Sequence, residues 1–190
     1  MKKILVPGIL GAVVVYIWGM VSWMALPWHN ATMKDLPNGD AIGAALTVSN
    51  TPSGVYVYPD MEGQTNGEMA SGETAATKPK PYIFMTYVAE GYAADWKPYV
   101  GGFVLNLITA MLVGYLLTKA SNTLTQYSHR VMFVTLMGVF AALVSHGAAW
   151  NWMLMPANYT LVMVADTIIA WLVAGLVMAR FIKPATAAAS

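Results

Sequence analysis

The fold is set by a long uncharged stretch near the start of the chain, residues 4–26, which reads ILVPGILGAVVVYIWGMVSWMAL. An α-helix rises about 1.5 Å per residue, so this stretch is long enough to cross about 30 Å of hydrocarbon. A cleaved signal peptide would have a shorter apolar region and small residues before the cut, whereas this zone holds Trp23, Met24 and Leu26. We therefore predict an uncleaved membrane anchor.

The composition of the whole chain points to the same class. Of its 190 residues, 57% are hydrophobic and only 10% are charged, whereas charged residues make up about 25% of an average soluble protein. Three more apolar stretches are long enough to span, at about residues 99–118, 131–150 and 159–182. We predict an all-α integral membrane protein with four transmembrane helices. Our domain assignment is helix 1 in 1–27, an outer segment in 28–98, helices 2–4 in 99–183, and a tail in 184–190.

The distribution of charge predicts the direction of insertion. Six basic residues flank one set of span ends without any acid: Lys2, Lys3, Lys119, Arg130, Arg180 and Lys183. By the positive-inside rule these ends are cytoplasmic, so both termini are inside and residues 28–98 are extracytoplasmic. We expect a prokaryotic cytoplasmic membrane. The net charge of +1 gives no basic surface for nucleic acid.

The outer segment reads as a small α+β domain. Asn38 or Asp40 can cap a short helix that runs to about Ser49. Residues 55–58 and 82–88 are rich in β-branched and aromatic residues and are predicted strands, whereas 60–81 is predicted to be a flexible loop. A segment this small cannot cover both faces of an apolar sheet by itself. The cover is expected to come from the outer membrane surface, the span ends, another membrane subunit or a second copy. The candidate partner-binding residues are Val55, Tyr56, Tyr58, Tyr82, Phe84 and Tyr87.

One ionisable residue, Asp166, lies within a predicted span, roughly 10 Å from its outer end. Four other polar residues fall at similar or shallower outer levels and complete a candidate intramembrane site: His146, Asn106, His29 and Ser22. The site has two interpretations. Asp166 could hydrogen-bond to Asn106 or His146 and fix the helix register, or His146 could exchange protons with Asp166 as its partner.

Methionine offers a metal-binding alternative on the same side. The chain has 14 methionines, and thioether and imidazole ligands together suit Cu(I). The candidate ligands are His29, His146, Met24, Met33, Met153 and Met155. Haem between His29 and His146 is a second alternative, whereas methionine as an apolar filler requires no cofactor at all.

Several features predict close contacts between helices. Small residues four apart occur in every span, for example Gly138 with Ala142, and they allow helices to approach closely. Trp18 and Trp171 lie mid-span, where a large ring is expected to pack against a neighbouring molecule or lipid. These features favour association.

Catalytic patterns are scarce. The sequence has no cysteine and no glycine-rich phosphate loop, and its predicted cytoplasmic parts are too short for a nucleotide domain. Ser145 and His146 are neighbours and point about 100° apart in a helix, so they do not form a hydrolase triad with Asp166. Our leading hypothesis is a non-catalytic accessory or scaffolding subunit of a membrane complex or homo-oligomer. The alternatives are a copper or proton-handling protein, and a membrane-embedded enzyme acting on a lipid or small apolar substrate.

Overall fold

The computed structural model describes residues 2–59, 80–93 and 95–184. The chain divides into two compact units, one formed by Met1–Lys34 with Asp95–Ser190 and the other by Asp35–Ala94. Most of the loop predicted over 60–81 and of the tail predicted over 184–190 lies outside the described residues.

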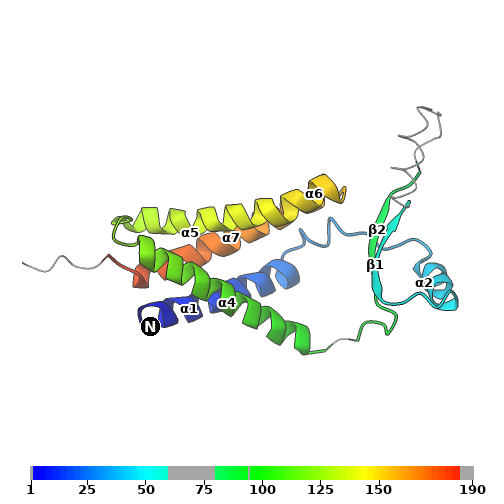
Figure 1. The fold of residues 1–190 in the computed structure, drawn as a ribbon, viewed down its shortest axis with the longest axis horizontal. Helices are drawn as coiled ribbons and strands as arrows, with labels where there is room; N and C mark the ends of the chain where they lie inside the picture. The colour runs from blue at the N-terminus through cyan, green and yellow to red at the C-terminus, as the bar shows by residue number, and fades with distance from the viewer. Residues whose placement is uncertain (1, 60–79, 94, 185–190) are drawn as a thin grey trace, which may run out of the picture. The chain divides into compact units, whose positions relative to one another are not determined.

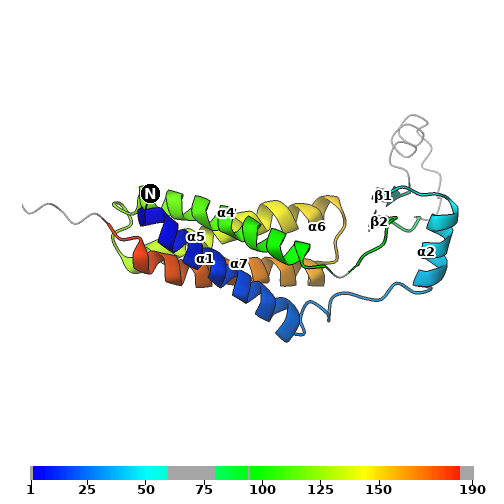
Figure 2. The same ribbon diagram turned by 90° about the horizontal axis from the view of Figure 1, so that it is seen from below.

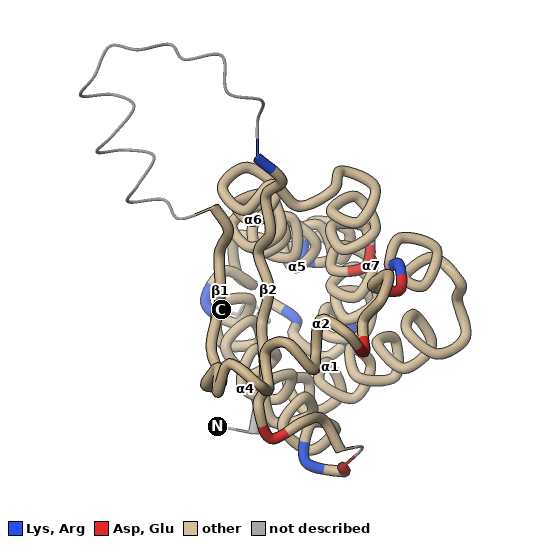
Figure 3. The backbone as a smooth tube through the Cα atoms, turned by 90° about the vertical axis from the view of Figure 1, so that its right-hand side faces the viewer, with Lys and Arg blue, Asp and Glu red and all other residues tan. Residues whose placement is uncertain are grey.

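The first unit is built from four long apolar helices, each long enough to cross a membrane. Their bounds are α1 (Lys2–Met20) with a π-helical extension (Val21–Ala25), α4 (Lys97–Ala120), α5 (Tyr127–Ala142) continued by a second π-helical segment (Leu143–Gly147) and α6 (Ala148–Trp152), and α7 (Ala157–Phe181). The mostly helical fold with four such helices, expected from hydropathy, is therefore present. Asp166 of α7 is the single acidic residue of these helices. Figure 3 colours the acidic and basic residues along the described backbone red and blue.

The helices form a bundle in which α1 packs against α4 and α7, and α5 packs against α7. The start of α1, the turn between α4 and α5, and the end of α7 meet at one end of the bundle (Figures 1 and 2). The buried core lies toward this end and consists of Val113, Leu117, Val134, Ala174, Met178 and Ile182. The basic residues that predict the cytoplasmic side therefore belong to one end of the bundle.

Arg130 links two parts of the chain at this end of the bundle. Its side chain is buried, and its guanidinium donates to the carbonyls of Leu124 at 3.0 Å, Thr125 at 2.7 Å and Ala179 at 3.4 Å. A buried charge is costly unless it is hydrogen-bonded, and Arg130 meets this requirement with backbone oxygens. It thereby ties the α4–α5 turn to the last turn of α7.

Small residues permit the close helix contacts within the chain itself. A Cβ atom added to Gly138 of α5 would lie 2.5 Å from Cβ of Trp171 of α7, and one added to Gly175 would lie 3.1 Å from the carbonyl oxygen of Val131. Such separations are shorter than ordinary van der Waals contact. The small-residue spacing therefore serves packing between α5 and α7 of one chain.

The two mid-span tryptophans also have partners within the chain, which corrects the expectation of a neighbouring molecule or lipid. Trp171 packs against the buried core and covers Gly138. Trp18 donates a hydrogen bond from its indole nitrogen to Asp166. A lone ring in a span can therefore be a partner for a polar group that lies far away in the sequence.

The second unit contains α2 (Gly39–Val48) and an antiparallel pair of strands, β1 (Gly54–Tyr58) and β2 (Ile83–Tyr87), in the register Tyr56 opposite Met85. Asn38 stands before α2 with a φ of 55° and makes no side-chain capping hydrogen bond, contrary to the capping role expected for it or for Asp40. Asn is one of the few residues that adopt this left-handed conformation readily.

The end of the hairpin is held by polar contacts. Ser53 donates a hydrogen bond to the carboxylate of Glu90 at 2.6 Å and accepts one from the N–H of Ala89 at 2.9 Å. The hydrogen bond from Ser53 lowers the pKa of Glu90, because it stabilises the ionised carboxylate. The two strands are thus joined at the point where the chain leaves β2.

None of the described residues of the second unit is buried. In the strand register, Val55 and Val57 share a face with Phe84 and Thr86, and the two valines are 62% and 40% exposed. Tyr56 and Tyr58 lie on the opposite face of β1. Both faces of this small sheet therefore carry accessible apolar or aromatic side chains.

Candidate functional site

The candidate site begins where α1 ends. The π-helical segment Val21–Ala25 widens the last turn, and the N–H of Leu26 donates to the carbonyl of Val21 at 3.1 Å. Pro27 then begins a turn in which the N–H of Ala31 donates to the carbonyl of Pro27 at 2.9 Å. The turn folds the chain back, so that His29 is fully buried although it lies beyond the helix.

Trp28 compensates for the irregular backbone. In a helix, the carbonyl of Ser22 would accept from the backbone nitrogen of Leu26 or of Pro27. The N–H of Leu26 donates to Val21 instead, and Pro27 has no N–H. The indole N–H of Trp28 donates instead, to the Ser22 carbonyl at 3.1 Å and to the Ser22 hydroxyl at 3.0 Å. The π-helical segment and the turn are therefore stabilised together by one side chain.

His29 is held on several sides. Its Nε2 atom lies 3.0 Å from the hydroxyl of Ser22 and 3.5 Å from Oδ2 of Asp166. The indole of Trp23 stacks on the imidazole, with centroids 3.9 Å apart, and Trp28 meets it edge-on. The His29 Nδ1 atom is buried and has no hydrogen-bond partner among the described residues.

Asp166 joins this cluster from α7. Its side chain is 14% exposed, and its Oδ1 accepts the hydrogen bond from Nε1 of Trp18 at 2.6 Å. This corrects the expected hydrogen-bond partners, which were Asn106 or His146, because no hydrogen bond joins either of them to Asp166. Trp18 and His29 hold the carboxylate instead, because the turn after α1 brings His29 back to the level of the helix.

The remaining predicted members form no hydrogen bond with this cluster, although His146 is near enough to Asp166 to interact with its charge. His146 lies in the second π-helical segment, with Nε2 3.3 Å from the hydroxyl of Thr167. The hydroxyl of Thr167 donates its hydrogen to the carbonyl of Met163 within α7. The same hydroxyl can therefore only accept a hydrogen bond from His146. Ser145 donates to the carbonyl of Ala141, which is consistent with its exclusion from a triad. Asn106 lines a separate pocket between α1 and α4.

The arrangement of Ser22, His29 and Asp166 differs from a hydrolytic relay. In such a relay the serine hydroxyl contacts one imidazole nitrogen and the carboxylate contacts the other. One nitrogen then takes the proton of the serine, while the carboxylate stabilises the imidazolium that forms. Here both groups face Nε2 and Nδ1 has no partner among the described residues. The contacts connect the end of the first span to α7.

The candidate metal ligands are distributed over different surroundings. Met24 is 74% exposed and lines the pocket that also contains Asn106, whereas Met155 lines a different pocket with Trp150. Met33 and Met153 are exposed. In the described part of the chain no group of three His, Cys, Asp or Glu side chains is placed to hold a metal ion.

The partner-binding residues predicted from the sequence lie in or beside the hairpin. Tyr58 is exposed and Tyr56 is half-buried with its hydroxyl donating to the carbonyl of Pro52. The other four of this set are Val55, which is exposed, and Tyr82, Phe84 and Tyr87, which are half-buried.

Sequence reasoning overlooked the role of three tryptophans: Trp23 and Trp28 contact His29, and Trp18 binds Asp166. Trp23 and Trp28 fall near the outer end of the span, where tryptophan is common at the interface, and so gave no separate signal. Trp18 did carry a usable signal in the sequence, because an indole N–H in the middle of a span needs a hydrogen-bond acceptor. Asp166, the one carboxylate of the spans, is the natural acceptor. Comparisons with protein families, with curated proteins and with solved structures found no match for this chain.

Proposed function

We propose that the chain is a four-span protein of a prokaryotic cytoplasmic membrane, with both termini inside and residues 28–98 outside. The four apolar helices and the basic residues at one bundle end support this topology. The absence of native cysteine allows a clean test. A membrane-impermeant maleimide should label a Thr47→Cys variant in intact cells, and a Ser128→Cys variant only after permeabilisation. The opposite labelling pattern would contradict the orientation.

We further propose that the protein is a non-catalytic subunit that binds another membrane protein, or its own copy, through the second unit. The observation that carries this proposal is the hairpin with accessible apolar or aromatic side chains on both faces, in a unit without a buried described residue. Such a sheet is stabilised when a partner removes its apolar surface from water. The Ser22–His29–Asp166 geometry, which lacks a relay through both imidazole nitrogens, is consistent with a structural cluster.

The test is the mass of the particle extracted from native membrane in mild detergent. We expect a particle larger than one chain for the wild type, and a shift to the single chain for Val55→Glu, because a buried carboxylate in the interface is costly. Val48→Glu is the matched control, since Val48 is 82% exposed on α2, outside the sheet. A wild type that is strictly a single chain, or equal behaviour of both variants, would refute the proposal.

Proton handling is the second candidate, and it is favoured by a specific observation. His29 lies fully buried with Nε2 3.5 Å from the Asp166 carboxylate, and its Nδ1 has no acceptor or donor in the described part of the chain. An imidazole facing a carboxylate in a low-dielectric site can take up a proton as an ion pair.

This candidate can be followed through the stacked indole of Trp23, because an imidazolium quenches tryptophan fluorescence when the rings are in contact. In lipid nanodiscs we expect a pH-dependent fluorescence step that disappears in His29→Gln and persists in His129→Gln, since His129 lies at the opposite end of the bundle. A step that persists in His29→Gln would rule out this site as its origin.

A further inference from the structure

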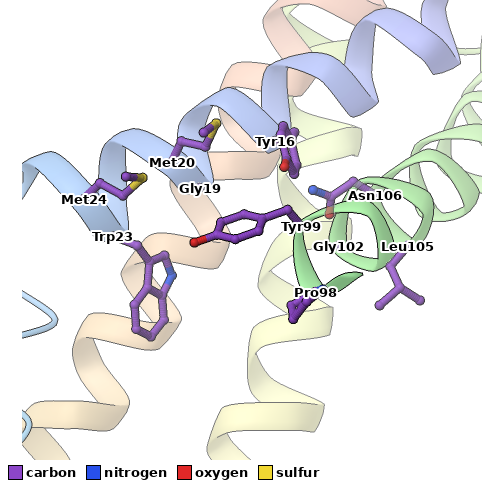
Figure 4. A pocket seen from close by; sticks show the side chains of 10 residues that line it. All are labelled: Tyr16, Gly19, Met20, Trp23, Met24, Pro98, Tyr99, Gly102, Leu105 and Asn106. Carbon is purple, nitrogen blue, oxygen red and sulfur yellow. The ribbon is translucent and has the colours of Figure 1, made fainter. Parts of the chain in front are cut away.

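A pocket of about 310 Å³ lies between α1, its π-helical extension and α4. Figure 4 shows its lining, with Trp23 and Tyr99 as aromatic rings on the two sides and Met20 and Met24 along one wall. The volume falls in the range of about 300 to 1,000 Å³ that is typical of small-molecule sites. All of the lining residues belong to the first unit.

Two polar side chains are placed at the same level of this pocket, one from each helix. Tyr16 lies nine residues before the end of the first span at Ala25, and Asn106 lies nine residues after the start of α4 at Lys97. At 1.5 Å per residue both lie about 14 Å along their helices. In Figure 4 the amide of Asn106 points toward Tyr16.

These polar groups lack partners. Neither the hydroxyl of Tyr16 nor the side-chain amide of Asn106 forms a hydrogen bond within the described part of the chain, and Tyr16 makes only an edge-on ring contact with Phe103. Water, which would serve such groups at a protein surface, is scarce in the hydrocarbon layer, so an unpaired amide there is costly. A ligand that carries hydrogen-bond acceptors would remove this cost.

We propose that this pocket binds the ring of a membrane-soluble quinone. A quinone carbonyl oxygen has two lone pairs and can accept two hydrogen bonds at once, one from the N–H of Asn106 and one from the O–H of Tyr16, which lie at the same end of the pocket. Its flat face suits the aromatic walls of Trp23 and Tyr99, and the flexible side chains of Met20 and Met24 can adapt to ring substituents. A phospholipid acyl chain would fill the same space but would leave both donors unpaired.

The pocket is also connected to the candidate site. Trp23 lines the pocket and at the same time stacks on His29, so one indole separates the bound ring from the imidazole. Occupation of the pocket would fix Trp23 against His29. This connection also supplies the signal for a binding assay, because quinones quench nearby tryptophans.

The experiment is a titration of the full chain in nanodiscs with decylubiquinone, followed by tryptophan fluorescence. We expect saturable quenching, with the affinity weakened about ten-fold in Asn106→Leu and in Tyr16→Phe, each of which removes one hydrogen bond. Ile108→Ala is the control, because Ile108 lies on the same helix, is exposed and is not part of the pocket. Its affinity should equal that of the wild type.

A second probe distinguishes a quinone site from a merely apolar groove. Decylbenzene has the ring and the chain without the carbonyl oxygens, and it should compete at least ten-fold more weakly than decylubiquinone. Equal competition by decylbenzene, or unchanged affinity in both Asn106→Leu and Tyr16→Phe, would overturn the proposal. Should Asn106→Leu fail to fold, the conservative Tyr16→Phe variant decides the question alone.

Discussion

The hydrogen bond between Trp18 and Asp166 can be isolated by a double-mutant cycle. Trp18→Phe removes the indole N–H that lies 2.6 Å from Oδ1 of Asp166. A hydrogen bond to a charged group contributes about 1.5 to 3 kcal/mol, and the smaller ring also loses some packing. We therefore expect Trp18→Phe to lower the free energy of unfolding by about 3 kcal/mol. Asp166→Asn keeps an acceptor in place but removes the charge, so the bond falls to about 1 kcal/mol.

The cycle separates the bond from the packing loss, because the packing loss is the same in both backgrounds. Trp18→Phe should cost about 1 kcal/mol more in the wild type than in the Asp166→Asn background. Unfolding is followed by steric trapping in bicelles, with Trp152→Phe, at an exposed site, as the control for loss of an indole. A coupling energy below about 0.3 kcal/mol would show that the carboxylate does not depend on Trp18.

Three further outcomes follow from the geometry. Gly138→Ala should lower the free energy of unfolding by about 1 to 3 kcal/mol by forcing α5 and α7 apart, while Gly101→Ala, which has open space around it, should not lower it; equal effects in the same trapping assay would refute the close contact. Arg130→Met should cost about 3 kcal/mol, because it leaves backbone carbonyls of the bundle end unpaired, and a neutral result in a denaturation curve would contradict that. Glu90 has a pKa lowered from 4.5, so the stability it contributes is present above that value and is lost as the pH falls through the folded pKa; NMR titration of Ser53→Ala should show the pKa returning toward 4.5, and an unchanged pKa would exclude the hydrogen bond as the cause.

The helices of the first unit could be predicted closely from the sequence because hydropathy is a local property. The span expected at about 159–182 is Ala157–Phe181 in the structure, and the one expected at about 99–118 is Lys97–Ala120. The helices extend slightly beyond the predicted spans. The added positions include charged residues such as Lys97, which a search for apolar stretches leaves out. The two π-helical segments have no such local signal, since they depend on the packing of the whole bundle.

Of the five polar residues predicted to form one site, Ser22, His29 and Asp166 are in contact, but the sequence did not predict which atoms pair. Asp166, His29 and Ser22 stood out because polar groups are costly at this depth. Their pairing depends on the turn that starts at Pro27, which returns His29 into the bundle, and a straight continuation of the helix would have carried it away. Helix periodicity relates residues within one helix, so it could not place Trp18 against a carboxylate of α7.

The hydrogen bonds of Arg130 have a consequence for the order in which the helices assemble. Two of its acceptors, the carbonyls of Leu124 and Thr125, precede it in the chain and exist as soon as α5 is made, whereas the carbonyl of Ala179 appears about fifty residues later in synthesis. In the proposed topology, the guanidinium would stay solvated at the membrane surface until α7 is made, and it would hold the α4–α5 hairpin in one orientation. In that topology, Arg130 would first help to orient the α4–α5 hairpin. It would form its hydrogen bonds to α7 only after all four helices are in place.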